Sequence, residues 1–131
     1  ERGFGRIVNI TSSSVLAAIP GLDLSSGARA GLTSFLGGVA RPAAAKNVTI
    51  NQILPGKFDT DRIRTNLEFL AGKKGTDLET EADASKEVIP AKRFGTPDEF
   101  GALCAFLCSA HAGYITGQNF LIDGGQNPNA F

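Results

Sequence analysis

Methionine and tryptophan are absent from this 131-residue sequence, which has only one histidine, one tyrosine and two cysteines. So few histidines and cysteines do not supply the four ligands of a structural zinc site, and we expect no metal. No hydrophobic run approaches the ~20 residues that a membrane-spanning helix needs, so we expect no membrane partner. Basic and acidic residues number 13 each, and this balance argues against nucleic acid and membrane surfaces as partners.

Two further predictions concern the two cysteines and the first residues of the chain. Cys104 and Cys108 stand four residues apart in a helical pattern, which predicts reduced thiols in the core of a cytoplasmic protein. The chain begins with ERGFGRIVNI, in which charged residues lead directly into a β-branched run. An abrupt start of this kind, without methionine, predicts a piece of a longer protein.

Short β-branched runs alternate with helical patterns along the chain. The runs are nearly continuous in apolar residues, as in strands of a parallel sheet that is covered on both faces. This order predicts parallel β-α-β units with right-handed crossovers. The predicted strands are 6–11, 47–56 and 117–125, and the predicted helices are 24–41, 61–72 and a third that begins after Thr96.

The first predicted helix has an apolar face at the spacing of an amphipathic helix. Asp23 or Ser25 is expected to cap its start. Pro42 is expected to end or kink it, because proline lacks the backbone N–H and clashes with the preceding turn. The apolar positions are Ala28, Leu32, Phe35, Leu36 and Val39.

The last predicted helix has a strong start signal, and the segment before it is highly charged. Thr96 suits the N-cap position, Pro97 the first helical position and Glu99 the third. Residues 73–92, KKGTDLETEADASKEVIPAK, are the most charged part of the chain. We expect this charged segment to be a mobile surface excursion.

Three polar segments are candidates for a binding site. TSSS follows the first predicted strand, PGKFDTD follows the second, and LSSGARAG begins the first helix. Ligands of parallel α/β proteins bind beyond the carboxyl ends of the strands, so we expect the three segments to converge. Serine-rich and Pro-Gly segments are also common in plain connecting loops, and that interpretation stays open at this point.

Read together, these segments resemble the C-terminal half of the classical short-chain dehydrogenase/reductase family. GRIVNITSSS is similar to the family strand that ends in the catalytic serine. NVTINQILPGKFDT is similar to the next strand and to the PG-x-x-x-T loop beside the nicotinamide. GTPDEFGALCAFLCSAHAGYITGQNFLIDGG resembles the family's last helix and strand. The resemblance covers nearly all of residues 1–125.

The resemblance implies an α/β fold, namely the C-terminal part of a Rossmann-type doubly wound parallel sheet with the N-terminal half absent. Residues 1–131 are then a portion of one domain, and residues 61–95 form a substrate lid. The implied cofactor is NAD or NADP, although the fingerprint G-x-G-x-x-G does not occur in this chain. The implied substrate is a small carbonyl compound or alcohol. The many small residues of helix 24–41 predict close approach of another backbone, and the resemblance implies a homodimer or homotetramer built through this helix. Packing of the helix only against its own sheet is the alternative.

The resemblance also assigns roles to single residues. Ser12 takes the place of the serine that hydrogen-bonds the substrate carbonyl or hydroxyl. Pro55, Gly56, Phe58 and Thr60 take the place of the cofactor-binding loop, in which Thr60 matches the threonine that contacts the nicotinamide carboxamide. Thr60 also suits the N-cap of the helix that follows.

Ser25 and Arg29 stand where the family has its catalytic tyrosine and lysine. A serine is a far weaker acid than a phenol of reference pKa ~10. Arginine keeps the positive charge but does not shuttle a proton, and its fork is expected to hold the cofactor ribose or an anion. Neither Tyr114 nor His111 stands in a catalytic position of the family.

Two hypotheses follow from this departure. The first is an NAD(P)-dependent oxidoreductase with a divergent site, in which Ser12, Ser25 and Arg29 are catalytic. The second is a catalytically impaired relative that binds a nucleotide or another ligand, or that serves in assembly.

Overall fold

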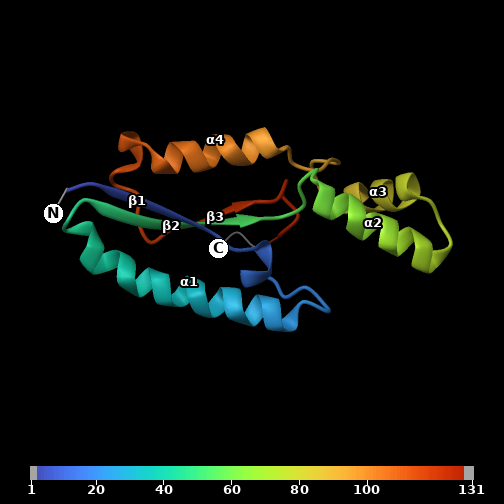
Figure 1. The fold of residues 1–131 in the computed structure, drawn as a ribbon, viewed down its shortest axis with the longest axis horizontal. Helices are drawn as coiled ribbons and strands as arrows, with labels where there is room; N and C mark the ends of the chain where they lie inside the picture. The colour runs from blue at the N-terminus through green and yellow to red at the C-terminus, as the bar shows by residue number, and fades with distance from the viewer. Residues whose placement is uncertain (1–2, 129–131) are drawn as a thin grey trace.

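The computed structural model describes residues 3–128, which form a three-stranded sheet with helices on both faces (Figure 1). The three predicted strands and the three predicted helices are present, although β3 is shorter than 117–125. In chain order the elements are β1 (Gly5–Ile10), a 3₁₀ turn (Ser13–Val15), α1 (Asp23–Ala44), β2 (Val48–Pro55), α2 (Asp61–Lys74), α3 (Leu78–Glu87), α4 (Pro97–Cys108), a second 3₁₀ turn (Ala110–Ala112) and β3 (Asn119–Ile122).

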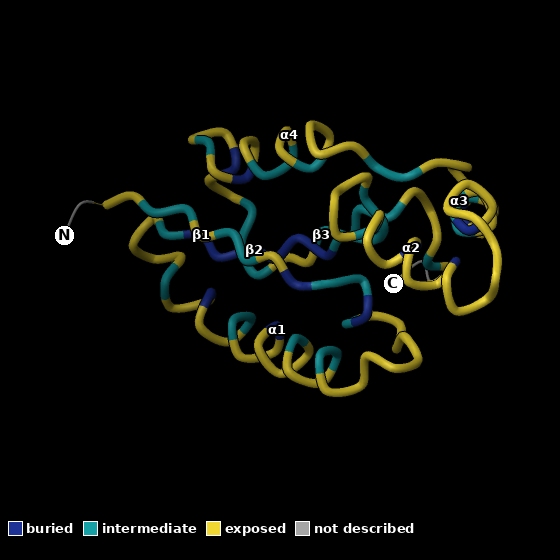
Figure 2. The backbone as a smooth tube through the Cα atoms, turned by 45° about the vertical axis from the view of Figure 1, so that its right-hand side comes forward, coloured by how far each residue is buried: buried dark blue, intermediate teal, exposed yellow. Residues whose placement is uncertain are grey.

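All three strands run parallel in the order β1-β2-β3, so β2 is central. The backbone of β2 is the main buried segment (Figure 2), and Ile53 and Leu54 have no exposed surface. Helix α1 covers one face of the sheet and α4 the other (Figure 1). The prediction of an α/β fold with a parallel sheet is therefore confirmed.

Strand β1 lies at one edge of the described sheet. It pairs with β2 from Gly5 opposite Val48 to Ile10 opposite Ile53, and no strand within residues 3–128 lies along its other edge. Ile7 and Ile10 are exposed, Ile10 by 60%. The prediction of a strand buried on both faces is therefore wrong for β1 in this chain, because an edge strand is not fully covered.

Helix α1 does not present its apolar face to the sheet. Thr33 and Ala40 are buried against the sheet, whereas Phe35 is 66% exposed and Leu24 is 92% exposed. Small and polar residues therefore make the sheet contact, because they let the helix approach closely. Of the five apolar positions at helical spacing, only Leu36 is partly buried, and Ala28, Leu32, Phe35 and Val39 are exposed.

Both ends of α1 also differ from the expectation. Leu22 is the N-cap and makes no side-chain cap bond, so neither Asp23 nor Ser25 caps the helix. Pro42 lies inside the helix, which continues to Ala44. A proline this close to the end removes only one of the last backbone hydrogen bonds, so the helix is not ended at that point.

The charged segment 73–92 is largely helical, so the prediction of a mobile excursion is wrong. Helix α2 ends at Gly75, whose φ of 72° is left-handed, and Asp77 then caps α3 by accepting from the Thr80 N–H at 2.7 Å. The buried Glu81 carboxylate accepts from Lys74 Nζ at 2.7 Å and from Thr76 Oγ1 at 2.9 Å. The hydrogen bond from Lys74 lowers the pKa of Glu81 most, and Thr76 adds to this effect. The charges of Lys74 and Glu81 are therefore paired inside the α2–α3 hairpin.

The cysteines of α4 are both free, and they differ in burial. Cys104 is half-buried, and burial raises the pKa of its thiol. Cys108 is exposed, so the prediction that both thiols lie in the core is wrong for Cys108. The fully buried residue of this helix is Leu107.

Two expected absences concern the described part of the chain. No helix between residues 3 and 128 is both long and apolar enough to span a membrane. Over the same residues, no three His, Cys, Asp or Glu side chains gather as a metal site requires.

Candidate active-site cleft

A cleft of about 700 Å³ opens at the carboxyl end of the sheet. Its walls come from the residues that follow β1, β2 and β3, from the start of α1 and from the first turns of α2. All seven site residues expected from the sequence line it, namely Ser12, Ser25, Arg29, Pro55, Gly56, Phe58 and Thr60. The predicted convergence of the three polar segments is therefore observed.

Ser12 lies two residues after the end of β1 and is the N-cap of the first 3₁₀ turn. Its backbone is extended, with φ −170° and ψ 152°, and its Oγ accepts from the Ser14 N–H at 3.1 Å. This bond uses a lone pair and leaves the hydroxyl hydrogen without an acceptor among the described residues. Ser12 is thus held in place and can donate a hydrogen bond into the cleft.

Arg29 links the start of α1 to the end of β1. Its Nε donates to the Thr11 carbonyl at 3.3 Å, and its Nη1 donates to the Ser25 carbonyl at 3.2 Å. The same Nη1 also donates to Ser25 Oγ. Two of the three nitrogens of the guanidinium group are therefore engaged within the protein.

The contact between Arg29 and Ser25 defines what this pair can do. Ser25 Oγ accepts a charge-assisted hydrogen bond, and its own hydroxyl hydrogen remains available to a ligand. Arginine does not release its proton, so the pair polarises a bound oxygen but does not relay protons. Tyr114 and His111 do not line the cleft, so neither replaces the missing phenol.

The β2–α2 loop is held against β3 and α4. The Gly56 N–H donates to the Ile122 carbonyl at 2.9 Å, which extends the β2–β3 pairing. A Cβ on Gly56 would lie 2.8 Å from the Asp123 Cα, so only glycine fits at this position. The Phe58 ring packs edge-on against Phe100 with ring centroids 5.6 Å apart.

Thr60 occupies the N-cap position of α2, as predicted, but its side chain does not cap the helix. Its Oγ1 instead makes a long bond of 3.4 Å to the Phe58 carbonyl. The Thr60 hydroxyl therefore retains most of its capacity to bind a ligand at the cleft.

Sequence reasoning missed several polar residues of the cleft, including Lys57, Arg62, Asn66 and Asp123. Lys57 is half-buried, its Nζ donates to Ser85 Oγ at 2.7 Å, and burial lowers its pKa. Lys57 lies inside the PGKFDTD segment, so that motif contained the signal that could have identified it. Arg62 and Asn66 lie one turn apart on α2, and no signal in the sequence marked which face of α2 meets the cleft.

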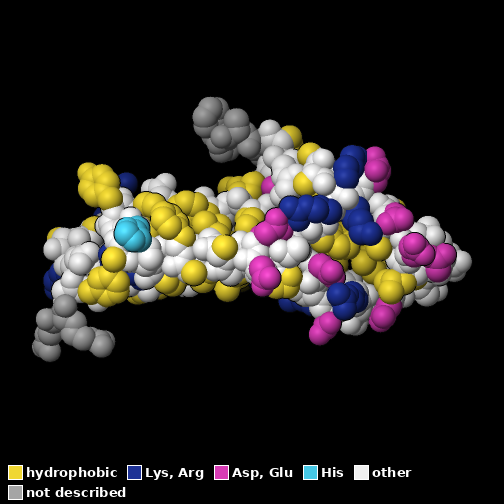
Figure 3. Space-filling model, turned by 90° about the horizontal axis from the view of Figure 1, so that it is seen from above, with side chains coloured by type: hydrophobic (Ala, Val, Ile, Leu, Met, Phe, Trp, Pro, Cys, Tyr) yellow, Lys and Arg dark blue, Asp and Glu magenta, His cyan; other side chains and the backbone are white. Residues whose placement is uncertain are grey.

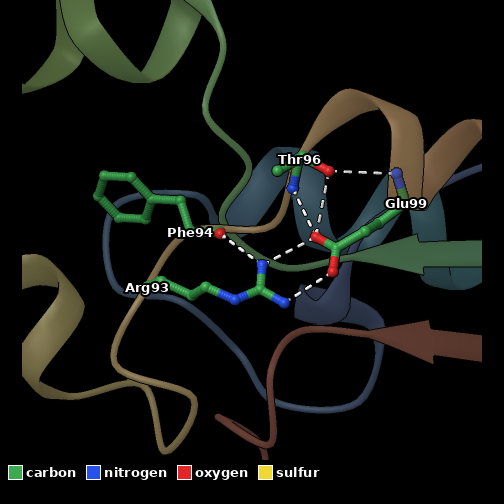
Figure 4. A network of polar contacts seen from close by, with 4 residues as sticks. All are labelled: Arg93, Phe94, Thr96 and Glu99. Atoms are coloured by element: carbon green, nitrogen blue, oxygen red, sulfur yellow. Dashed lines mark hydrogen bonds and ion pairs between the residues drawn. The ribbon is translucent and has the colours of Figure 1, made fainter.

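A polar network fixes the start of α4 (Figure 4). Arg93 donates through both terminal nitrogens to the Glu99 carboxylate, at 2.8 and 2.6 Å. Thr96 and Glu99 form the predicted capping box, with the Thr96 N–H donating to Glu99 Oε2 at 2.8 Å. The Arg93 hydrogen bonds and the Thr96 N–H lower the pKa of Glu99 to about 2.

This network predicts a pH-dependent loss of stability. The folded-state pKa of Glu99 lies below its free value of 4.5, so its stabilising effect is complete above 4.5 and declines as the pH falls towards 2. In Glu99→Gln we expect a lower melting temperature at neutral pH and a smaller loss on acidification. Thermal melting of the full-length protein in a pH series measures both effects. Asp98→Asn, in the same turn but without an ion pair among the described residues, is the control, and an equal pH dependence in both variants would contradict the prediction.

Comparison with known proteins places these observations in a family. The family of enoyl-(acyl carrier protein) reductases matches residues 1–127. Nodulation protein G of Azospirillum brasilense is 37% identical over 127 residues, covering 97% of this chain and 47% of that protein. The acetoacetyl-CoA reductase of Cupriavidus necator is 35% identical over 125 residues, covering 95% of this chain and 46% of that protein.

A solved structure shows the same arrangement of helices and strands. The NADPH-dependent reductase YwfH, involved in bacilysin biosynthesis, superimposes with a TM-score of 0.90 at 32% identity, over 97% of this chain and 48% of that chain. The chain thus spans about half the length of the relatives that it matches. The chain belongs to the short-chain dehydrogenase/reductase family.

Proposed function

We propose that this chain provides the substrate-binding part of an NAD(P)-dependent oxidoreductase that interconverts a carbonyl compound and an alcohol. One observation carries the proposal, namely that all seven residues expected from the family resemblance line a single cleft at the carboxyl end of the sheet. The relatives described as reductases agree with this chemistry. We assign the activity to the full-length protein.

The nicotinamide end of the cofactor fits the donors at the β2–α2 loop. Thr60 Oγ1 has only one long internal bond, so it is available to the carboxamide, against the wall formed by Pro55, Gly56 and Phe58. Arg29 Nη2 has no acceptor among the described residues and suits a ribose hydroxyl. When bound, the cofactor supplies or accepts the hydride. NAD and NADP are both compatible with these contacts.

Two hydroxyl groups would hold the reacting oxygen of the substrate. Ser12 donates one hydrogen bond, and Ser25, polarised by Arg29, donates a second. The proton that completes the alcohol comes from water, since neither serine is acidic enough to supply it. Residues 61–95 form the lid of the cleft, to which α2 contributes Arg62, Ile63 and Asn66.

We further propose a cytoplasmic homodimer or homotetramer that assembles through the outer face of α1. Leu24 and Phe35 are exposed on this face. Added Cβ atoms at Gly27 and Gly31 would contact nothing within 4 Å in this chain, so these glycines suit close approach by a second helix.

Hydride transfer by the full-length protein tests the proposed function. We expect consumption of NADH or NADPH with at least one member of a panel of ketones, and a roughly 10²-fold lower kcat/KM in Ser12→Ala, as for a lost oxyanion donor. Light scattering on the same preparation is expected to show a dimer or tetramer. Cofactor binding without turnover, or full activity in Ser12→Ala, would contradict the proposed oxidoreductase activity. A monomer in light scattering would contradict the proposed dimer or tetramer.

A second candidate is a relative that has lost catalysis and serves in ligand binding or assembly. The serine at position 25 favours it, because the site lacks a phenol. Cofactor binding without turnover in the same experiment would support this function.

A further inference from the structure

We propose that the cleft selects carbonyl substrates that carry a negatively charged group, a carboxylate or a phosphate, and that Lys57 and Arg62 bind this group. The inference rests on the proposed function and specifies the substrate class of that site.

The charges that line the cleft are predominantly positive. Three cationic side chains, Arg29, Lys57 and Arg62, face one acidic side chain, Asp123. Both oxygens of Asp123 are already engaged, because Oδ1 accepts from the Gly125 N–H at 2.9 Å and Oδ2 from the Asn127 N–H at 2.8 Å. Asp123 therefore stabilises its own turn, and it forms no ion pair with the three cations among residues 3–128.

None of the three cations of the cleft forms an ion pair with a carboxylate in residues 3–128. The carboxylates nearest to Arg62 in sequence, Asp59 and Asp61, both pair with Arg64. By contrast, acidic and basic side chains lie side by side over α2 and α3 (Figure 3). The paired cations outside the cleft are Arg64, Lys74, Lys86, Lys92 and Arg93.

Lys57 and Arg62, the two cations on the lid side of the cleft, are available to bind an anionic group. Arg29 is committed to Thr11 and Ser25, as described above. Lys57 Nζ donates to one neutral hydroxyl, that of Ser85, and two of its three hydrogens have no acceptor in the described chain. A half-buried ammonium without a counter-ion is costly, and burial lowers its pKa accordingly. A bound anion would remove this cost.

Part of the lining of the cleft is apolar. Ala17, Ala18, Ile19 and Leu22 precede α1, and they line the cleft together with Ile63 of α2. The lining therefore suits a substrate with an apolar body and an anionic end, whose carbonyl group lies at Ser12.

Matched pairs of charged and neutral ketones test the inference with the full-length protein. Levulinate is compared with methyl levulinate, and dihydroxyacetone phosphate with dihydroxyacetone, which distinguishes the carboxylate from the phosphate. We expect kcat/KM to favour the charged member of at least one pair by roughly ten- to hundredfold, the range of one or two hydrogen bonds to charged groups. In Lys57→Gln and in Arg62→Gln, the ratio of kcat/KM for the charged ketone to kcat/KM for the neutral one is expected to fall about tenfold, mainly because KM for the charged ketone rises. Added salt is expected to lower the same ratio in the wild type, because salt screens the charges.

Lys73→Gln is the matched control, because Lys73 also lies on α2 but does not line the cleft. The ratio is expected to stay at the wild-type value in this variant. Equal kcat/KM within both pairs, or an equal loss in Lys73→Gln, would overturn the inference.

A binding measurement separates this inference from the proposed function. Levulinate and dihydroxyacetone phosphate are added to the protein without cofactor, and the melting temperature is recorded. A rise with a charged compound that is lost in Lys57→Gln supports the anion site even if no ketone is reduced. No rise with either compound overturns it even if a neutral ketone is reduced. The melting temperature of each variant alone shows whether it folds.

Discussion

The double substitution Ser25→Tyr with Arg29→Lys is expected to raise the rate of carbonyl reduction by the full-length protein roughly 10²- to 10⁴-fold. This range is the contribution of one positioned general acid. Both residues line the cleft and contact each other at the start of α1. The substitution therefore places a phenol and an ammonium in a site that already contains Ser12 and Thr60.

The physical reason is the acidity of the group beside the substrate oxygen. A tyrosine of reference pKa ~10 becomes more acidic next to a lysine ammonium, because the positive charge favours the phenolate. The cleft of about 700 Å³ leaves room for an aromatic ring. Replacing Arg29 by lysine removes the hydrogen bond from Nε to the Thr11 carbonyl. The free energy of one hydrogen bond is small compared with the expected gain in rate.

A phenylalanine control isolates the proton donor. Ser25→Phe with Arg29→Lys introduces a ring of nearly the same size without the hydroxyl, and we expect it to stay at the wild-type rate or below. Steady-state kinetics with NADH and NADPH and one ketone measure kcat for all three proteins. Equal rates in the tyrosine and phenylalanine variants would show that the missing phenol does not limit the reaction.

The sequence predicted the parts of the fold that depend on local signals. The β-branched run around Ile53 forms a buried strand, and the Thr96–Glu99 capping box begins α4 as expected. The convergence of Ser12, Arg29 and the loop at Gly56 also followed from a local rule, because parallel strands end at the same edge of a sheet.

The errors arose where burial depends on tertiary contacts. The periodicity of α1 identified its apolar face, and this face is exposed, while the polar Thr33 packs on the sheet. No local signal distinguishes a face that meets the sheet from one that meets a second subunit. The charge of segment 73–92 suggested mobility, but Glu81 is buried and bound by Lys74, a pairing that only the α2–α3 turn creates.

In the cleft, the surroundings of the Lys57 side chain also depend on tertiary contacts that the sequence does not reveal. The sequence places Lys57 in the PGKFDTD segment after the second strand, but its burial and its bond to Ser85 depend on α3, which was not predicted. The positive character of the cleft therefore became visible only with the tertiary structure.

Gly56→Ala is expected to destabilise the full-length protein by roughly 1–3 kcal/mol, the usual cost of overpacking a close contact. The added Cβ would lie 2.6 Å from the Asp123 Cβ and 2.8 Å from its Cα. Backbone atoms on the partner strand cannot move aside as a flexible side chain does, so the β2–α2 loop must shift. This shift stretches the bond from the Gly56 N–H to the Ile122 carbonyl and moves Thr60 away from its place in the cleft.

Gly72→Ala provides the matched control for this substitution. Gly72 lies within α2, and a Cβ there would contact nothing within 4 Å, so we expect a gain of up to ~1 kcal/mol from helix propensity. Chemical denaturation measures the free energy of unfolding of both variants, and cofactor titration measures the effect on binding. We expect Gly56→Ala to bind NADH or NADPH more weakly, whereas Gly72→Ala binds them as the wild type does. Wild-type stability in Gly56→Ala would mean that the loop relaxes freely, and the close contact with Asp123 would then not hold the cofactor loop in place.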